Sequence, residues 1–222
     1  MNISAIKSLA VVALAASPLL AAAQLSANVS LNTSYKFRGQ DQTANKPALQ
    51  GGFDYAFANG LYVGNWNSNV TLPTGSLEMD LYGGYKGEVS GIGYDVGVLH
   101  YAYPGASSFK TTEVYGGLSY AGFSAKYSHT VSSQYFGSGS KAGYLSLGYS
   151  TEISKGLTLS AAVGLTDFKQ KALTDFTDYS VGLGYDLGDG YSVKAAFVGA
   201  NKKAVYGDIN KNRLVLTVAK AM

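Results

Sequence analysis

Glycine recurs along this chain at a nearly fixed interval, and the residues between the glycines alternate in polarity. Gly52, Gly84, Gly117, Gly148 and Gly182 lie 31 to 34 residues apart. Helical solenoids also have repeats of this size, but their apolar residues recur at every third or fourth position, whereas here they recur at every second. The repeat unit is therefore predicted to be a pair of β-strands.

Twelve alternating stretches follow one another, most close to the length of about 9 to 11 residues that a tilted strand needs to cross a bilayer. Short turns and long polar loops alternate between them, which is typical of an up-and-down outer-membrane barrel. We therefore predict an all-β fold, a transmembrane antiparallel barrel of about 12 strands with both termini at the short-turn end. The expected strands cover residues 28–37, 48–57, 61–70, 77–87, 92–103, 112–120, 123–131, 142–153, 157–166, 178–187, 191–200 and 212–221.

The N-terminal segment has the features of a secretory signal peptide. A short basic region ends at Lys7, and the apolar stretch that follows, residues 9–23, contains Pro18 and closes on three alanines. It is shorter than the roughly 20 uninterrupted apolar residues of a spanning helix. We predict a cleaved signal peptide over residues 1–23 and one mature domain over residues 24–222, located in the outer membrane of a Gram-negative bacterium.

Charge and cysteine content argue against several classes of protein. The chain has 17 basic and 14 acidic residues, a balance too weak to indicate a nucleic-acid partner. Charged residues make up 14 % of the chain, against roughly 25 % in soluble domains. With no cysteine and two histidines, we expect no disulfide, no dedicated metal site and no cofactor.

Alternate residues of nearly every expected strand separate into an apolar set and a small or polar set. Val181 and Leu183, for example, oppose Gly182 and Gly184. An exported β-sandwich would show the same alternation. Aromatic residues gathered at the strand ends favour the barrel, because they resemble the two interfacial girdles of membrane barrels. The expected girdle residues are Tyr35, Phe37, Phe57, Tyr62, Tyr120, Phe123, Tyr179, Tyr185 and Tyr191.

Two expected strands depart from this pattern. One carries Asn65, Asn67 and Asn69 on the face opposite its aromatic residues, and we predict that these asparagines face a polar lumen. In the strand over residues 92–103 the apolar positions change face near Leu99. This change predicts a β-bulge or a slip of register at that point.

Seven short motifs are spread along the chain: Tyr35–Gly39, Gln42–Thr43, Pro47–Tyr55, Gly60–Gly64, Glu78–Tyr85, Tyr94–Gly97 and Glu113–Gly117. They resemble those of the TorF family of proteobacterial porins. The resemblance covers most of the mature chain and implies an outer-membrane barrel with a channel role, surrounded by lipid and inserted by the barrel-assembly machinery. Met222 departs from the usual pattern, since such barrels commonly end in an aromatic residue that this machinery recognises.

Charged residues expected on the inner face are the candidates for solute selection. Both signs occur in similar number, so two interpretations stay open: a salt-bridge network that fills the barrel, or a constriction that selects small solutes by charge and size. Twelve strands fit either, because about eight strands are filled by side chains and about sixteen leave an aqueous channel. The candidates are Lys36, Arg38, Asp54, Glu78, Asp80, Asp95, Glu113, Lys126, Lys194 and Arg213, with Arg38 at the mouth of the first loop.

We therefore expect a barrel that lets small polar solutes or ions diffuse passively and has no catalytic residue. The alternative is a closed-lumen barrel that acts as a structural or surface-interaction protein through its long loops. A lipid-hydrolysing barrel enzyme is less favoured. His129 precedes Ser132 and Ser133, yet no neighbouring carboxylate or amide in the sequence would orient its ring. The sequence leaves the solute and the oligomeric state open.

Overall fold

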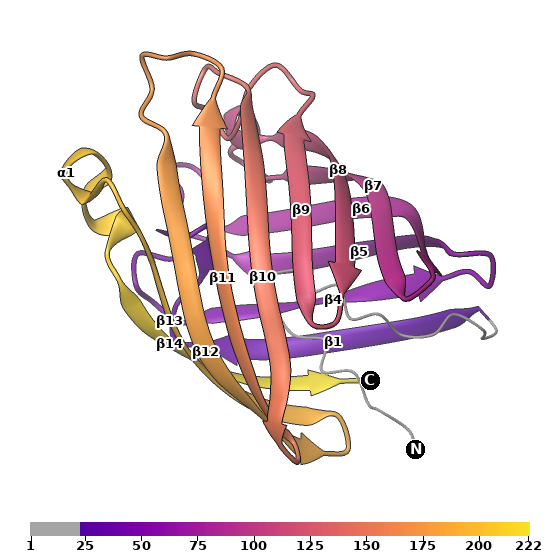
Figure 1. The fold of residues 1–222 in the computed structure, drawn as a ribbon. Coiled ribbons are helices and arrows are strands. Elements are labelled where there is room, and N and C mark those ends of the chain that lie inside the picture. The colour runs from indigo at the N-terminus through magenta and orange to yellow at the C-terminus, as the bar shows by residue number, and fades with distance from the viewer. Residues whose placement is uncertain (1–22) are drawn as a thin grey trace.

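The described residues of this computed structural model, 23–222, form a closed antiparallel β-barrel (Figure 1). All but the last residue of the predicted signal peptide lie outside the described residues. Strand β1 pairs with both β4 and β14, so the sheet has no open edge and the predicted fold is confirmed. The twelve wall strands are β1 (Gln24–Asn32), β4 (Ala48–Ala56), β5 (Leu61–Asn69), β6 (Leu77–Val89), β7 (Ile92–Ala102), β8 (Thr111–Tyr120), β9 (Phe123–Thr130), β10 (Ala142–Ser154), β11 (Leu157–Phe168), β12 (Phe176–Gly188), β13 (Tyr191–Ala200) and β14 (Arg213–Ala221).

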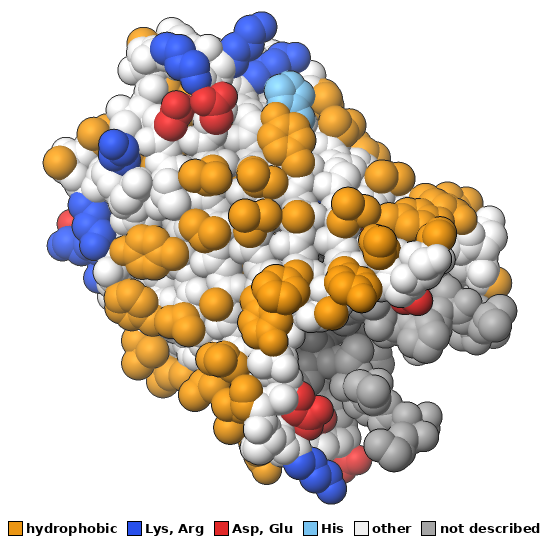
Figure 2. Space-filling view, in the orientation of Figure 1, with side chains coloured by type: hydrophobic (Ala, Val, Ile, Leu, Met, Phe, Trp, Pro, Cys, Tyr) orange, Lys and Arg blue, Asp and Glu red, His pale blue; other side chains and the backbone are white. Residues whose placement is uncertain are grey.

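Along the wall strands, apolar side chains point outward and small or polar ones point inward. In β12, Val181, Leu183 and Tyr185 are each nearly half exposed, while Gly182 between them is buried. Figure 2 shows such apolar side chains spread over the visible wall. So many exposed apolar side chains are unfavourable in water, and a bilayer would cover them.

Most short turns use residues in the left-handed region. Ser90–Gly91, Ala121–Gly122 and Asp189–Gly190 each place two consecutive residues at positive φ, between 48° and 86°. This is the requirement of the type I′ hairpin turn, whose twist matches that of the strands. The C-terminal residue lies at the same end, where the Met222 N–H donates to the carbonyl oxygen of Ala27 at 2.8 Å.

The long loops at the other end carry the remaining regular elements. They hold the small strands β2 (Lys36–Phe37) and β3 (Gln40–Asp41), and the helical turns η1 (Ser107–Phe109), α1 (Lys203–Tyr206) and η2 (Gly207–Asn210). Within residues 23–222, none of the helices has the length and apolar character needed to cross a membrane.

The recurring glycines occupy inward positions in the alternation of their strands, and Gly52 shows why one of them is needed. A Cβ added to Gly52 would lie 1.9 Å from the carbonyl oxygen of Asn65 in β5. At Gly182 the added Cβ would lie 2.9 Å from the carbonyl oxygen of Ala195 in β13. At these positions glycine permits a close approach between neighbouring strand backbones and leaves room inside the barrel.

The prediction that Asn65, Asn67 and Asn69 line the lumen is wrong. Leu61 and Val63, on the same face of β5, are about half exposed on the outer wall. Because side chains on a strand alternate between faces, the three asparagines also point outward.

Two of the amides bind the backbone of the neighbouring strand. Asn65 Oδ1 accepts the N–H of Phe53 at 3.2 Å, and Asn69 Oδ1 accepts the N–H of Leu49 at 2.7 Å. These bonds offset part of the cost of placing a polar side chain on the apolar wall. The opposite face of β5, which carries Tyr62, turns into the lumen, so the girdle prediction for Tyr62 is also wrong.

The predicted bulge near Leu99 is absent from β7, which pairs with β6 and β8 in unbroken register. Leu99 and Tyr101 point inward and pack in an apolar cluster inside the barrel. The pattern changes there because part of the lumen is itself apolar. Register shifts occur instead between Glu152 and Ser154 in β10 and between Asp186 and Gly188 in β12.

Candidate functional site

The candidate site is the barrel lumen, which the first long loop fills at the long-loop end. We call this loop, residues 33–47, the plug; it contains the β2–β3 hairpin. The hairpin turn is Arg38–Gly39, with φ of 48° and 73°. A Cβ on Gly39 would lie 2.6 Å from the carbonyl oxygen of Gly199. The tip of the plug therefore abuts the barrel wall.

Hydrogen bonds within the plug fix its shape. Thr43 is fully buried, and its Oγ1 accepts the N–H of Tyr35 at 3.1 Å and donates to the carbonyl oxygen of Lys46 at 2.7 Å. Asp41 Oδ1 accepts the N–H groups of Thr43 and Asn45 at 3.0 and 3.1 Å. The plug is thus an ordered element rather than a loose connection.

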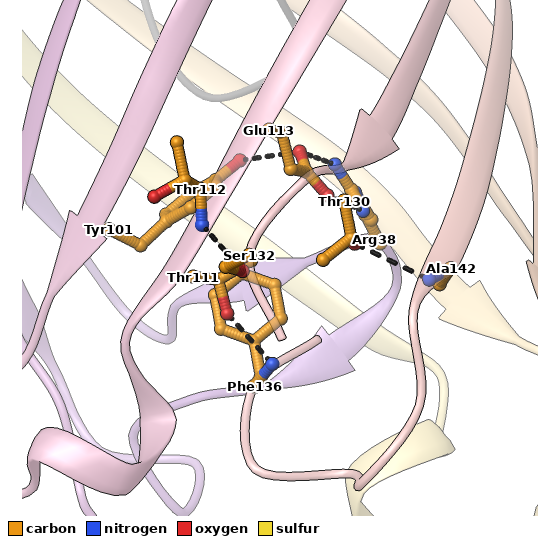
Figure 3. Close-up of polar contacts among 9 residues, drawn as sticks. All are labelled: Arg38, Tyr101, Thr111, Thr112, Glu113, Thr130, Ser132, Phe136 and Ala142. Atoms are coloured by element: carbon orange, nitrogen blue, oxygen red, sulfur yellow. Dashed lines mark hydrogen bonds and ion pairs between the residues drawn. The ribbon is translucent and has the colours of Figure 1, made fainter. Parts of the chain in front are cut away.

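A buried salt bridge joins the plug to the wall. Arg38 Nη1 and Nη2 donate to Glu113 Oε1 and Oε2 at 3.0 and 2.6 Å, and their side chains are 6 % and 1 % exposed (Figure 3). Tyr101 Oη donates to the same carboxylate at 3.3 Å. The ion pairs of Lys171 and Lys211 in other long loops are exposed, so the Arg38–Glu113 pair differs from them in its burial.

Aromatic rings enclose the Arg38 guanidinium. Its central carbon lies 4.1 Å from the ring centroid of Tyr144, 4.8 Å from that of Phe37 and 5.4 Å from that of Tyr135. Burial raises the pKa of Tyr135 to about 12. Cation–π contacts of this kind strengthen when water is excluded.

A second loop, residues 131–141, covers the plug from the long-loop end. The Phe136 ring packs edge-to-face on Phe37, Tyr101 and Tyr135, with centroid distances of 5.5, 4.8 and 4.5 Å. The Phe136 N–H donates to Thr111 Oγ1 at 2.8 Å (Figure 3). This loop therefore adds apolar packing to the polar contact at Arg38.

The girdle prediction is also wrong for Tyr35 and Phe37. Tyr35 is 3 % exposed and its ring lies 5.4 Å from that of Trp66, while Phe37 packs beside the same apolar cluster. Both residues belong to the plug because β1 ends at Asn32, earlier than the sequence predicts. The chain turns inward at that point.

A buried pair of carboxylates lies beside the plug on β6. Glu78 and Asp80 occupy consecutive inward positions, and Tyr35 Oη donates to Glu78 Oε1 at 3.1 Å. Asp80 Oδ1 has no hydrogen-bond partner within residues 23–222. Of the three buried carboxylates of Glu78, Asp80 and Glu113, only that of Glu113 forms an ion pair with Arg38 within residues 23–222.

The half of the lumen nearer the short turns is lined by small residues, phenols and charges. Tyr82 Oη donates to Asp54 at 2.7 Å, and Lys126 Nζ lies 3.6 Å from the ring centroid of Tyr115. Asp54, Lys126 and Lys194 are partly exposed although they point inward. These three charged side chains therefore reach solvent, in contrast to the buried Glu78 and Glu113 of the plugged half.

The structure places eight of the ten candidate residues on inward faces of wall strands: Asp54, Glu78, Asp80, Asp95, Glu113, Lys126, Lys194 and Arg213. The other two, Lys36 and Arg38, lie in the plug. Lys36 does not lie on a wall strand as predicted, because β1 ends before it. Its Nζ donates to the carbonyl oxygen of Ile209 at 2.9 Å, and burial lowers its pKa to about 8.

The sequence did not indicate the aromatic residues that contact the plug, or one inward acidic residue. Tyr101 and Phe136 contact the plug, and Asp178 accepts a hydrogen bond from Tyr144 Oη at 3.2 Å inside the barrel. The shift of alternation near Leu99 was the available signal, because it placed apolar residues on an otherwise polar face.

The arrangement expected of a hydrolase is not seen around the histidines. Both lie on outward faces, and His100 Nδ1 pairs with Thr112 Oγ1 at 2.9 Å. Ser132 Oγ donates to the carbonyl oxygen of Gln134 at 3.0 Å. Between residues 23 and 222, no hydrogen bond joins a histidine to a serine, and no three histidine, aspartate or glutamate side chains cluster as metal ligands would.

A family model described as "Bacterial protein of unknown function (Gcw_chp)" matches residues 13–222. The chain belongs to the Gcw_chp family. The match establishes this family and does not test the resemblance of the motifs to the TorF family. No curated protein sequence matches the chain.

Solved structures similar to this Gcw_chp barrel include outer-membrane porins and channels. The KdgM porin is 12 % identical with a TM-score of 0.59, over 88 % of this chain and 98 % of that chain. The NanC porin is 11 % identical with the same TM-score, over 89 % and 98 %. The COG4313 outer membrane channel from Pseudomonas putida F1 is 9 % identical with a TM-score of 0.51, over 91 % and 96 %. At these low sequence identities, the similarity shows a shared fold only.

Proposed function

We propose that this protein is an outer-membrane porin through which small polar solutes or ions diffuse passively, and that the plug closes it in the conformation described here. The observation that carries the proposal is the inverted polarity of the barrel, whose outer face is apolar and whose inner face is polar and charged. A lumen of this kind can solvate a polar solute within a membrane.

The similar folds and the TorF-like motifs support the same role. Two solved neighbours are titled porins, and one title describes the KdgM porin in complex with oligogalacturonate. We propose small polar solutes as the transported class because the lumen of this chain is polar and charged. Export by the predicted signal peptide and insertion by the assembly machinery belong to the same proposal.

A second candidate function is favoured by the plug itself. The bidentate contact between Arg38 and Glu113 and the buried aromatic rings around it give the long-loop half of the barrel a packed interior. A barrel that never opens would be a structural or surface-interaction protein. The two functions differ in whether the plug can leave the lumen.

Liposome swelling separates the two functions. Liposomes that contain the purified protein are placed in iso-osmotic solutions of small neutral sugars and compared with liposomes without protein. The porin should accelerate swelling, and smaller sugars should enter faster. Swelling equal to that of empty liposomes, both for the protein and for variants with a weakened plug, would favour the closed-lumen function.

Neutralising the β6 carboxylates should change the ion preference of the open channel. In the double variant Glu78→Gln and Asp80→Asn, the inner face loses two negative charges, so cations are attracted less strongly than before. We expect the reversal potential in a salt gradient to shift toward the value of an anion-selective channel. The matched control is Asp208→Asn, which neutralises an exposed acid in a long loop. If the double variant and the control had the same reversal potential, neither carboxylate would lie in the part of the lumen that selects ions.

A further inference from the structure

We propose that the outer face of β5 is an interface at which a second copy of this chain docks in the membrane. The inference rests on insertion of the barrel in a bilayer, as proposed above, and is independent of whether the lumen conducts. It starts from the three outward asparagines, Asn65, Asn67 and Asn69, which occupy three of the five outward positions of β5. No other wall strand within residues 23–222 has an amide side chain on its outer face.

Asn65 lies within the apolar wall, whereas Asn69 is the last residue of β5. Asn65 is the central residue of β5, and it pairs with Phe53 on one side and Leu81 on the other, both more than half exposed. Polar groups that face hydrocarbon without a partner are unfavourable, because lipid tails offer no hydrogen bond. A protein partner at this position would remove that cost.

Two polar groups of this strip have no partner within residues 23–222. Asn69 uses both ends of its amide, on Leu49 and Pro47. Asn65 uses its oxygen but not its Nδ2 donor, and Asn67 donates to the carbonyl oxygen of Gly51 at 3.4 Å but leaves its oxygen free. One unused donor and one unused acceptor thus stand on neighbouring outward positions of one strand.

This pair of groups is self-complementary. Two copies inserted in the same direction are related by a two-fold axis along the membrane normal, so the same face of β5 meets itself at the same depth. Asn65 Nδ2 of each copy can then donate to Asn67 Oδ1 of the other, which gives two symmetric hydrogen bonds. Gly51, beside Asn67, carries no side chain that would hold the second copy away. A second copy supplies the missing donor and acceptor together, which a lipid tail cannot do.

Introduced thiols can test this contact, because the natural chain contains no cysteine. Val63→Cys places one thiol on the outer face of β5 and leaves the asparagines intact. The control, Val163→Cys, places a thiol on the outer face of β11, on the opposite side of the barrel. Membranes carrying each variant are treated with a short bifunctional thiol reagent. We expect a covalent dimer for Val63→Cys and only monomer for Val163→Cys.

The asparagines are tested by adding Asn65→Leu and Asn67→Leu to Val63→Cys. Loss of both hydrogen bonds should weaken the dimer about tenfold and reduce the crosslinked fraction toward that of the Val163→Cys control. Adding Thr151→Val, which removes an outward hydroxyl on β10, should leave the crosslinked fraction unchanged. Equal crosslinking at the two cysteine positions, crosslinking that survives both leucine substitutions, or a ladder of species larger than a dimer would overturn the proposal. Retained heat-modifiable gel mobility verifies that each variant is folded.

Discussion

Replacing Arg38 with alanine is expected to release the plug and speed solute entry. The substitution leaves Glu113 buried without its guanidinium partner, and breaking one half of a buried ion pair typically costs about 3 to 5 kcal/mol. If this cost falls on the plugged state alone, the ratio of open to plugged molecules rises by about two to four orders of magnitude. The swelling rate of liposomes that contain Arg38→Ala should therefore greatly exceed that of the natural protein.

Two controls separate plug release from general damage. Lys171→Ala removes an exposed ion pair with Asp167 in another long loop, where such pairs contribute roughly 0 to 1 kcal/mol, and should not change swelling. The double variant Arg38→Met with Glu113→Gln removes both charges, so no unpaired charge remains and the plug should close again in part. Equal swelling for Arg38→Ala and the natural protein, with folded barrels in both, would contradict the role of the salt bridge.

Replacing Gly52 with alanine is expected to disrupt the pairing of β4 with β5. The new Cβ would lie 1.9 Å from a carbonyl oxygen of the neighbouring backbone, which can move only by separating the strands. Overpacking in a well-ordered interior usually costs about 1 to 3 kcal/mol, occasionally more, and contact with backbone places this case at the upper end. Urea unfolding followed by the fluorescence of Trp66, the single tryptophan, measures the loss.

The matched control is Gly184→Ala, another inward strand glycine. Its added Cβ would meet its nearest neighbour, the carbonyl oxygen of Val193, at 3.9 Å, an ordinary contact. We expect a change within about 1 kcal/mol, because alanine fits there and also restricts the unfolded chain. If the two glycine variants unfolded at the same urea concentration, the close approach of the β5 backbone would not be the reason that position 52 requires glycine.

The sequence predicted the wall of the barrel well because lipid and lumen impose opposite polarities on a strand. Val181 and Gly182 follow that rule directly, and so do the strand ends marked by turns such as Asp189–Gly190. The rule fails at β5, because the polarity of Asn65 predicts a lumen position whereas its side chain points outward. The neighbouring β4 backbone satisfies part of that amide, a cross-strand contact that polarity within one strand cannot reveal.

The plug could not be foreseen from local pattern. Arg38 and Glu113 are separated by 75 residues, and nothing in either segment indicates that a polar loop will fold inward. The one signal in the sequence is the change of face near Leu99, from which a bulge is predicted. This change of face marks an inward apolar patch, against which the aromatic rings of the plug pack. The contact forms only when the strands are closed into a barrel.

Single-channel recording in a planar bilayer is the most direct test that solutes cross through this lumen. The recording uses Arg38→Ala combined with Ser146→Cys, which places one thiol on the inward face of β10. We predict discrete conductance steps that become smaller when a bulky thiol reagent is added, and that do not change when Ser146 is left in place. The absence of steps at every voltage and salt concentration, or steps unaffected by the modified lumen, would contradict the account.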